Sequence, residues 1–288
     1  MPLCLTPTLR DRIANADRPQ YGMWVCSGSP LIAEICAGGG LDWLLIDMEH
    51  TPNSLETTLT QLQAIAAYPA TPVVRLPSSD AVTIKRVLDL GAQTIIVPSI
   101  SSASEARELV QAVRYPPHGR RGVGSALARS ARWNRVDDYL ARADAHTSLF
   151  VQIETIAGVH AAGEIAAVDG VDGVFVGPSD LAASMGLLGQ QMHPDVQAAV
   201  LSTFAAVQGA GKPVGVNIFD PSIARRYAEA GASFLLVGAD VAMLARGSEK
   251  LVSDFIPEPE GDASYNGALP VGADTSGVGE TKPVSAHA

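Results

Sequence analysis

Eight short apolar segments, each followed by a stretch of helical character, constrain the fold of this 288-residue chain more than any other feature. Apolar runs of this length that alternate with helices are typical of parallel strands buried on both faces. Eight such repeats predict an α/β fold, a (β/α)8 or TIM barrel. A doubly wound open sheet is the competing arrangement, but no glycine-rich dinucleotide fingerprint follows the first segment. The segments are YGMWV (21–25), WLLID (43–47), PVVRLP (72–77), TIIVP (94–98), SLFVQI (148–153), GVFVG (173–177), PVGVN (213–217) and FLLVG (234–238).

The barrel is expected to occupy residues 1–255, because the composition changes beyond that point. Residues 256–288 are rich in Pro, Gly, Ala, Ser and Glu, which predicts a disordered tail. Within the barrel, the stretch RYPPHGRRGVGSALARSARWN at 114–134 is far longer than an ordinary connection in an α/β repeat. Long loops of this kind usually carry function.

The acidic balance of the chain, with a formal charge of −10, argues against binding to nucleic acid or to an anionic membrane. Its three cysteines are too few and too irregularly spaced for a disulfide framework. No segment resembles a signal peptide, and no run of 18 apolar residues occurs. We therefore expect a soluble, cytoplasmic protein that acts on a small molecule.

Polar residues gather where the predicted strands end, which is where a (β/α)8 barrel carries its active site. Any one of the carboxylates there could instead cap a helix, but that interpretation does not account for the whole set. The residues are Trp24, Asp47, Glu49, His50, Arg75, Gln152, Glu154, Ser179, Asp180 and Asn217.

Two of these carboxylates, Glu154 and Asp180, follow the fifth and sixth strands and should converge on one face of the barrel. Both offer hard oxygen ligands without a neighbouring histidine, which favours Mg²⁺ or Mn²⁺, with Co²⁺ and Ni²⁺ as alternatives. The pattern GPSDL around Asp180 is also typical of a helix N-cap.

Arg75 and His50 suggest the chemistry beside that metal. A guanidinium at the end of an apolar strand is suited to a carboxylate or a developing oxyanion, although a structural ion pair with Asp47 or Glu49 is the alternative. His50 is the one histidine at a strand end and is a natural general base, unless it is purely structural.

A Schiff-base mechanism is not expected, because no lysine falls at the active end of the predicted barrel. The four lysines are Lys85 within a helix, Lys212 before the seventh strand, Lys250 in the last helix and Lys282 in the tail.

The motifs LLIDMEH, PVVRLP, the 114–134 stretch, LFVQIET and GVFVGPSDL, in this order, closely resemble the HpcH/HpaI aldolase family over about residues 8–255. The resemblance implies a class II, metal-dependent pyruvate aldolase, a carbon–carbon lyase of aromatic-acid degradation. Its substrate would be 4-hydroxy-2-oxoheptanedioate, cleaved to pyruvate and succinic semialdehyde, with tolerance for other aldehydes and 2-keto acids. It also implies a homohexamer, a trimer of dimers, in which the last helix is exchanged between subunits.

Residue by residue, the resemblance implies that Glu154 and Asp180 are the metal ligands, His50 the proton acceptor and Arg75 the transition-state stabiliser. Gln152 and the Ser179 backbone would contact pyruvate, beside Gly177, Trp24 and Asn217, while Asp47 and Glu49 support the site. Asp89 would raise the basicity of the histidine from a neighbouring subunit.

Two positions depart from the family pattern and leave the aldehyde preference open: Asn217 replaces an apolar residue, and Ser179 stands where some members have Ala. A lyase of the same barrel type for a 2-keto-3-deoxy sugar acid or a CoA thioester is the alternative, with Arg120 and Arg121 as a basic entrance for CoA phosphates. A non-catalytic keto-acid sensor is the alternative from another class.

Overall fold

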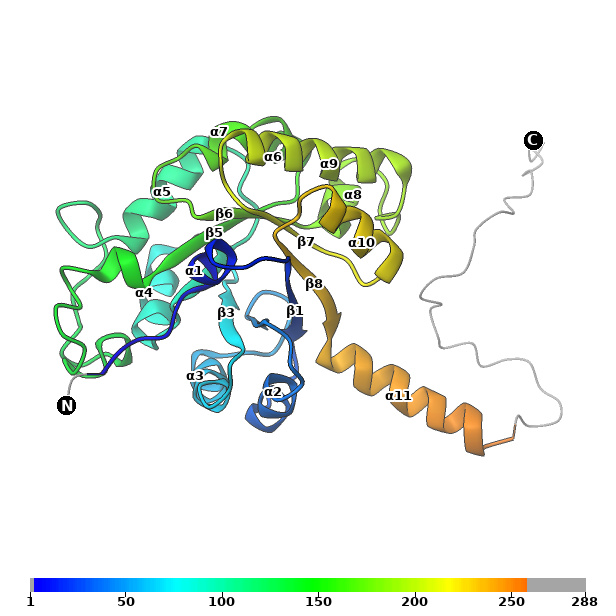
Figure 1. The fold of residues 1–288 in the computed structure, drawn as a ribbon, viewed down its shortest axis with the longest axis horizontal. Helices are drawn as coiled ribbons and strands as arrows, with labels where there is room; N and C mark the ends of the chain where they lie inside the picture. The colour runs from blue at the N-terminus through cyan, green and yellow to red at the C-terminus, as the bar shows by residue number, and fades with distance from the viewer. Residues whose placement is uncertain (1–2, 258–288) are drawn as a thin grey trace, which may run out of the picture. The chain divides into compact units, whose positions relative to one another are not determined.

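The computed structural model describes residues 3–257, and its centre is a closed barrel of eight parallel strands in the order β1 to β8 (Figure 1). The (β/α)8 prediction is therefore confirmed. The strands are β1 (Gln20–Val25), β2 (Trp43–Asp47), β3 (Thr71–Arg75), β4 (Thr94–Val97), β5 (Ser148–Ile153), β6 (Gly173–Val176), β7 (Val214–Asn217) and β8 (Phe234–Ala239).

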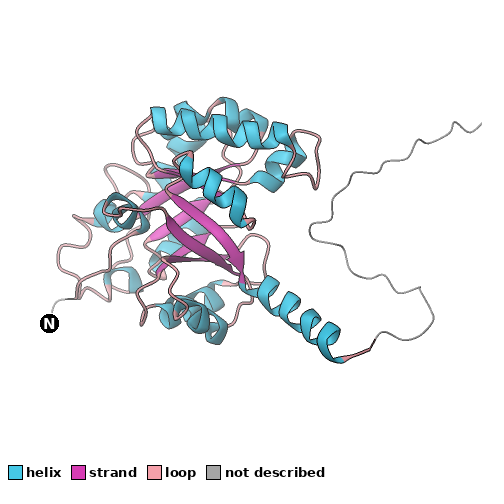
Figure 2. Cartoon of the chain, turned by 45° about the vertical axis from the view of Figure 1, so that its right-hand side comes forward, coloured by secondary structure: helices cyan, strands magenta, loops and turns pink. Residues whose placement is uncertain are grey.

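Most of the helices lie around the strands, as Figure 2 shows in cyan around magenta. The described helices are α1 (Leu9–Ala14), α2 (Pro30–Ala37), α3 (Leu55–Ile65), α4 (Ala81–Asp89), α5 (Ala103–Val113), α6 (Ile156–His160), α7 (Ala162–Ala166), α8 (Pro178–Ser184), α9 (Pro194–Gly209), α10 (Pro221–Glu229) and α11 (Asp240–Phe255), with 3₁₀ turns η1 (Arg129–Ala131) and η2 (Ala143–His146). None of these described helices is long and apolar enough to cross a membrane.

The chain is divided into two units after Gly247, a residue of α11. The first holds the barrel and its surrounding helices, and the second begins at Ser248 with the end of α11. The predicted disordered tail lies, from residue 258 onward, outside the described residues.

Alternate residues of each strand face the barrel interior and form one apolar cluster. It contains Trp24, Trp43, Leu45, Val73, Ile96, Phe150, Phe175, Phe234 and Leu236. Glycines make room for the largest rings: a β-carbon on Gly22 would lie 2.4 Å from the Trp43 ring, and one on Gly215 would lie 2.4 Å from the Phe234 ring. Continued by one more step, the same alternation places polar side chains over this cluster at the carboxyl-terminal end of the barrel.

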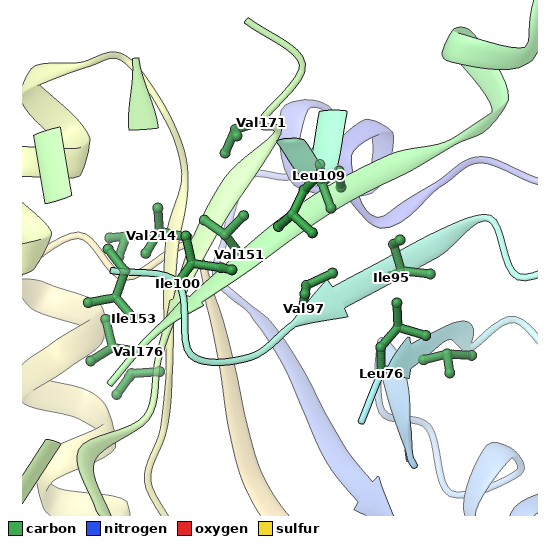
Figure 3. Packing of buried hydrophobic residues seen from close by; sticks show 14 of the residues in the cluster. Leu76, Ile95, Val97, Ile100, Leu109, Val151, Ile153, Val171, Val176 and Val214 are labelled. Carbon is green, nitrogen blue, oxygen red and sulfur yellow. The ribbon is translucent and has the colours of Figure 1, made fainter. Parts of the chain in front are cut away.

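The other strand face packs against the helices. Figure 3 shows this second apolar layer, in which Val151 and Ile153 of β5 lie among Leu109, Val176 and Val214. Because both faces of every strand are covered, the strands are largely apolar, and polar residues such as Asp47 and Arg75 lie at their ends.

Helix α1 contributes to the barrel interior from its amino-terminal side. Leu9 is fully buried in the interior cluster, and its amide donates to Thr94 Oγ1 at the start of β4. A capping box formed by Thr8 and Asp11 fixes where this helix begins.

The long stretch that follows α5 is largely irregular and builds a small core of its own. Tyr115, Ala131, Val136, Tyr139 and Ala143 form that core. Four residues of the irregular stretch, 132–134 and Asp138, have a positive φ although none is a glycine.

Candidate functional site

Arg75, the last residue of β3, is held by two acids that follow β2. Its Nε and Nη2 donate to Asp47 Oδ1 and Oδ2 at 2.8 and 2.9 Å, and its Nη1 lies 2.9 Å from Glu49 Oε2. The alternative interpretation of Arg75 as a structural ion pair is thus confirmed for both acids. The pair with Asp47 uses two of the five N–H groups of the guanidinium, so the ion pair does not exclude a role toward a bound anion.

Trp24, at the end of β1, forms the floor below Arg75. The guanidinium carbon lies 4.2 Å from the centre of its ring, an arrangement that adds a cation–π contact. The indole N–H donates to Asn217 Oδ1 of β7 at 3.0 Å. This bond orients the Asn217 amide at the carboxyl-terminal end of the barrel, next to the interior cluster.

Glu49 connects this arginine cluster to Glu154 and His50. Burial raises the pKa of Glu49, Arg75 lowers it, and the neighbouring negative charge of Glu154 raises it further. The imidazole of His50 is 63% exposed, with Nε2 3.8 Å from Glu49 Oε2. Groups from β2, β3 and β5 therefore share one electrostatic environment, with the His50 ring open to solvent.

Glu154, directly after β5, is buried and is fixed from two sides. Ser99 donates its amide and its hydroxyl to Oε1 at 2.8 and 2.9 Å, and the amide of Gln152 donates to Oε2. A β-carbon on Gly177 would lie 2.7 Å from Oε2. The carboxylate therefore packs closely against Gly177, where any larger side chain would displace it.

Asp180 and Ser179 lie in the first turn of α8, which follows β6, and both are exposed. The N-cap of that helix is Gly177, without a side-chain capping bond, so the interpretation of Asp180 as an N-cap is wrong. Within residues 3–257, the Asp180 carboxylate has neither a hydrogen bond nor an ion pair. Its oxygens are therefore free of partners among these residues, at the carboxyl-terminal end of the barrel.

This donor set fits a hard divalent cation. Glu154 supplies an oriented, buried carboxylate, and Asp180 supplies an unpaired carboxylate from the neighbouring strand end. In the described part of the chain, no group of three or more His, Cys, Asp or Glu side chains is arranged to hold a metal. A cation at this position would therefore complete its shell with water or substrate oxygens, as Mg²⁺ commonly does.

Asp89 does not belong to this cluster in the single chain. It ends α4, whose nine residues span about 13 Å and run back from the Arg75 side to the amino-terminal side of the barrel. Its Oδ1 accepts from Arg121 Nη2 at 2.8 Å. The side chain of Arg121 is only 1% exposed, and its guanidinium carbon lies 4.5 Å from the centre of the Tyr115 ring.

The predicted basic entrance of Arg120 and Arg121 is wrong. Arg121 is buried against Asp89 and Tyr115, and Arg120 is paired with Glu108 at 2.7 Å. Neither guanidinium is presented at the carboxyl-terminal ends of the strands. The path of the irregular stretch, which the sequence does not predict, turns both away.

Two residues at strand ends were missed by the sequence reasoning. Ser99 follows β4 with φ +60° and orients Glu154, and inspection of the strand-four end for polar residues would have found it. Asp240, after β8, is buried and accepts the amides of Cys26 and Ser27 at 2.8 and 3.0 Å. It fixes the loop that leaves β1 below the site.

The fold and the site define a TIM-barrel enzyme with an acidic, arginine-containing centre at its strand ends. The chain belongs to the HpcH/HpaI aldolase/citrate lyase family, whose match extends over residues 20–246, and it is a carbon–carbon lyase. It is 51% identical over 269 residues to the hydroxypyruvate/pyruvate aldolase of Deinococcus radiodurans, covering 91% of this chain and 97% of the relative. It is 52% identical over 241 residues to the 4-hydroxy-2-oxo-heptane-1,7-dioate aldolase of Shigella sonnei, covering 84% and 92%.

A solved structure shows the same architecture. A family protein from Burkholderia cenocepacia superposes with a TM-score of 0.82 at 42% identity, covering 86% of this chain and 99% of that protein.

Proposed function

We propose that the chain is a metal-dependent, class II pyruvate aldolase that reversibly cleaves 4-hydroxy-2-oxoheptanedioate to pyruvate and succinic semialdehyde. The observation that carries the proposal is the buried Glu154 carboxylate, oriented by Ser99 and packed closely against Gly177, with the unpaired Asp180 on the neighbouring strand end. The name of the Shigella sonnei relative supports the substrate.

Glu154 and Asp180 would hold Mg²⁺ or Mn²⁺, which when bound supplies Lewis-acid stabilisation of negative charge on a keto oxygen. Gln152 is held against Glu154 by its amide N–H, and its buried Oε1 has no hydrogen-bond partner among the described residues. That acceptor is available to a ligand, which supports a contact between Gln152 and the pyruvyl half of the substrate. Ser179, in the first turn of α8, would contribute its backbone amide, whose N–H lacks an intrahelical acceptor.

The bond-breaking step needs a base and a positive charge. His50 accepts the proton of the 4-hydroxyl, the C3–C4 bond breaks, and C4 becomes the aldehyde carbon. The electrons of that bond form the pyruvate enolate, which then takes a proton at C3. Arg75 stabilises the enolate oxygen, and Asp47 and Trp24 hold its guanidinium in place during the reaction.

Pyruvate release from 4-hydroxy-2-oxoheptanedioate, with and without EDTA, tests the proposal. Chelation should abolish release and added Mg²⁺ or Mn²⁺ should restore it, whereas full activity in EDTA would contradict a class II mechanism. His50→Ala should lower kcat at neutral pH by about 100-fold or more. Near-normal turnover of that variant would remove His50 as the base.

A second candidate is an aldolase whose nucleophile is hydroxypyruvate, as the name of the Deinococcus radiodurans relative suggests. Asn217 supports it, because its amide, oriented by Trp24, offers hydrogen bonds to an additional hydroxyl. Rates of aldol addition with pyruvate and with hydroxypyruvate, compared in wild type and Asn217→Leu, distinguish the two. Loss of the hydroxypyruvate reaction alone in the variant would favour this candidate.

We also propose that Asp89 serves the His50 of a neighbouring subunit in a homohexamer with an exchanged α11. The position of Asp89 at the far end of α4 from Arg75 supports an intersubunit role, and the exposed apolar side chains of Met243 and Leu244 on α11 support the exchange. Light scattering coupled to gel filtration measures the mass, and a monomer would contradict this assembly.

The other candidates are weaker. The basic entrance expected for a CoA thioester lyase is not formed by Arg120 and Arg121, because these residues pair with Glu108 and Asp89. A non-catalytic keto-acid sensor predicts pyruvate binding without metal-dependent exchange of the methyl protons for deuterium. Exchange observed by NMR would exclude the sensor.

A further inference from the structure

A charged cavity lies at the opposite end of the barrel from the proposed catalytic residues. Its volume is about 160 Å³, which is room for several waters or a small anion. The walls include Thr71 and Pro72, where β3 begins, and Gln93, just before β4. The cavity is therefore separated from the carboxyl-terminal strand ends by the apolar barrel interior.

Three arginines line this cavity, and no Asp or Glu does. They are Arg12 of α1 and Arg129 and Arg132 of the irregular stretch. The chain as a whole has 30 acidic and 20 basic residues, so a cavity with three arginines and no acid departs from its general balance.

Arg129 and Arg132 lie side by side. The Nη1 atoms of both lie 2.9 Å from the position that a β-carbon on Gly91 would occupy. Within residues 3–257, neither guanidinium forms an ion pair. Two adjacent half-buried positive charges without a carboxylate repel one another and are costly to desolvate. Burial, and then the charge of Arg132, lower the pKa of Arg129 to about 10.

A structural role accounts for only part of this arrangement. Arg129 Nη1 donates to the carbonyl of Leu90 at the C-terminus of α4, where a positive charge is favourable. Arg132 Nη1 donates to the carbonyl of Arg129 at 2.7 Å, and Arg12 Nη2 reaches the carbonyl of Pro69 at 3.4 Å. Each guanidinium has five N–H groups, so most of the donors of all three remain for a ligand.

We propose that this cavity binds a small oxyanion carrying two or more negative charges, held by Arg129 and Arg132 with Arg12 at its edge. Forked guanidinium donors match the geometry of phosphate and carboxylate oxygens, and the anion removes the repulsion between the two arginines. Since Arg129 and Arg132 belong to the same irregular stretch as Arg121, a bound anion also ties that stretch to the amino-terminal side of the barrel.

Isothermal titration calorimetry of the full chain with inorganic phosphate, and separately with succinate, tests the proposal and separates phosphate from dicarboxylate ligands. Arg129→Gln combined with Arg132→Gln should weaken binding by roughly tenfold or more, since each lost charge-assisted hydrogen bond has an effect of that order. Arg12→Gln should weaken it less. Arg225→Gln, which removes an exposed charge on α10, should leave it unchanged.

Unaltered binding in the double variant would overturn the proposal, since the anion would then occupy another position such as the catalytic centre. Absence of binding to wild type by both anions at millimolar concentration would also overturn it. If the double variant does not fold, Arg132→Lys and Arg12→Gln carry the test, because both leave the bond from Arg129 to Leu90 intact.

Discussion

Arg75 and Asp47 form a two-pronged ion pair between neighbouring strands, with bonds of 2.8 and 2.9 Å and with both side chains almost fully buried. The pair does two things at once. It neutralises a charge inside the barrel, and it orients the remaining guanidinium donors toward the space above the strands. If Arg75 acts as proposed, we expect stability and catalysis to depend on the same contact.

Asp47→Asn should reduce both properties. The substitution keeps the shape of the side chain but leaves Arg75 without its main counter-charge, and breaking a buried pair in this way costs about 3 kcal/mol. We expect a lower urea midpoint together with a fall in kcat. Arg18→Gln, which breaks the exposed pair with Asp42, should cost only about 0–1 kcal/mol. Equal losses for the two variants would contradict a special role for the buried pair.

Gly177→Ala should damage the site without unfolding the barrel. The added methyl would lie 2.7 Å from Glu154 Oε2 and 3.0 Å from Gln152 Nε2, so the carboxylate must move. We expect a loss of about tenfold or more in kcat/KM, as expected when a catalytic group is displaced by a fraction of an ångström. In Gly163→Ala of α7 the new methyl meets no atom closer than 3.7 Å, and this control should retain activity. An active Gly177→Ala enzyme would show that the position of the Glu154 carboxylate against residue 177 is not needed.

Ser99→Ala should weaken metal binding while leaving the ligands in place. Its hydroxyl bonds Glu154 Oε1, and removal of groups that orient a metal ligand typically lowers metal affinity by about 10- to 100-fold. Calorimetric titration with Mn²⁺ measures the effect directly. Ser202→Ala on α9 is the matched control, because the Ser202 hydroxyl donates to the carbonyl of Ala199 within the same helix. Unchanged affinity in Ser99→Ala would argue against Glu154 as a ligand.

Arg121→Ala should destabilise the protein far more than Arg120→Ala, although the two residues are adjacent. Loss of the buried Arg121 leaves Asp89 without its partner and empties the space against Tyr115, a change of about 3 kcal/mol. Arg120 pairs with Glu108 at an exposed position, and its loss should cost about 0–1 kcal/mol. Urea unfolding of both variants gives the comparison. Similar midpoints would mean that Arg121 does not anchor the irregular stretch.

Cys26 should resist alkylation at pH 8 although it is only partly covered. Burial, followed by the negative charges of Asp240 and Asp47, raises the pKa of its thiol from 9.0 to about 12. Because its pKa is raised, the Cys26 thiol stays protonated, and therefore unreactive, at pH values below about 12. Mass spectrometry after iodoacetamide treatment of the native protein should find Cys4, which is exposed, modified well before Cys26. Equally rapid modification of Cys26 would show that the surrounding acids do not suppress its ionisation.

The barrel and most of its polar rim were predictable because they follow from one periodic rule. Once β5 is assigned, Phe150, Gln152 and Glu154 must share a face, and the same applies to Asp47 on β2 and Arg75 on β3. The eight repeats then bring those faces together at one end. No knowledge of side-chain contacts is needed for that step.

The features that the sequence did not predict lie in segments without the regular side-chain alternation of a strand or the periodicity of a helix. Arg121, Arg129 and Arg132 belong to the irregular stretch, where non-glycine residues adopt a positive φ without a sequence signal for it. Their partners, such as Asp89, are therefore decided by the tertiary path of the chain. Ser99 is a different case, because it follows a strand that the sequence does predict. Its positive φ, which the sequence does not predict, accompanies its hydrogen bonds to Glu154.

The pairing of glycines with large rings inside the barrel constrains how homologous sequences can diverge. Gly22 faces only side-chain atoms of Trp43, so a larger residue could fit there if Trp43 were replaced by a smaller one. Gly215 faces the backbone carbonyl oxygen of Phe234 at 2.4 Å as well as its ring, so no change of that side chain makes room. Across an alignment of relatives, positions 22 and 43 should therefore covary in side-chain volume while position 215 remains glycine, even though none of them contacts the substrate.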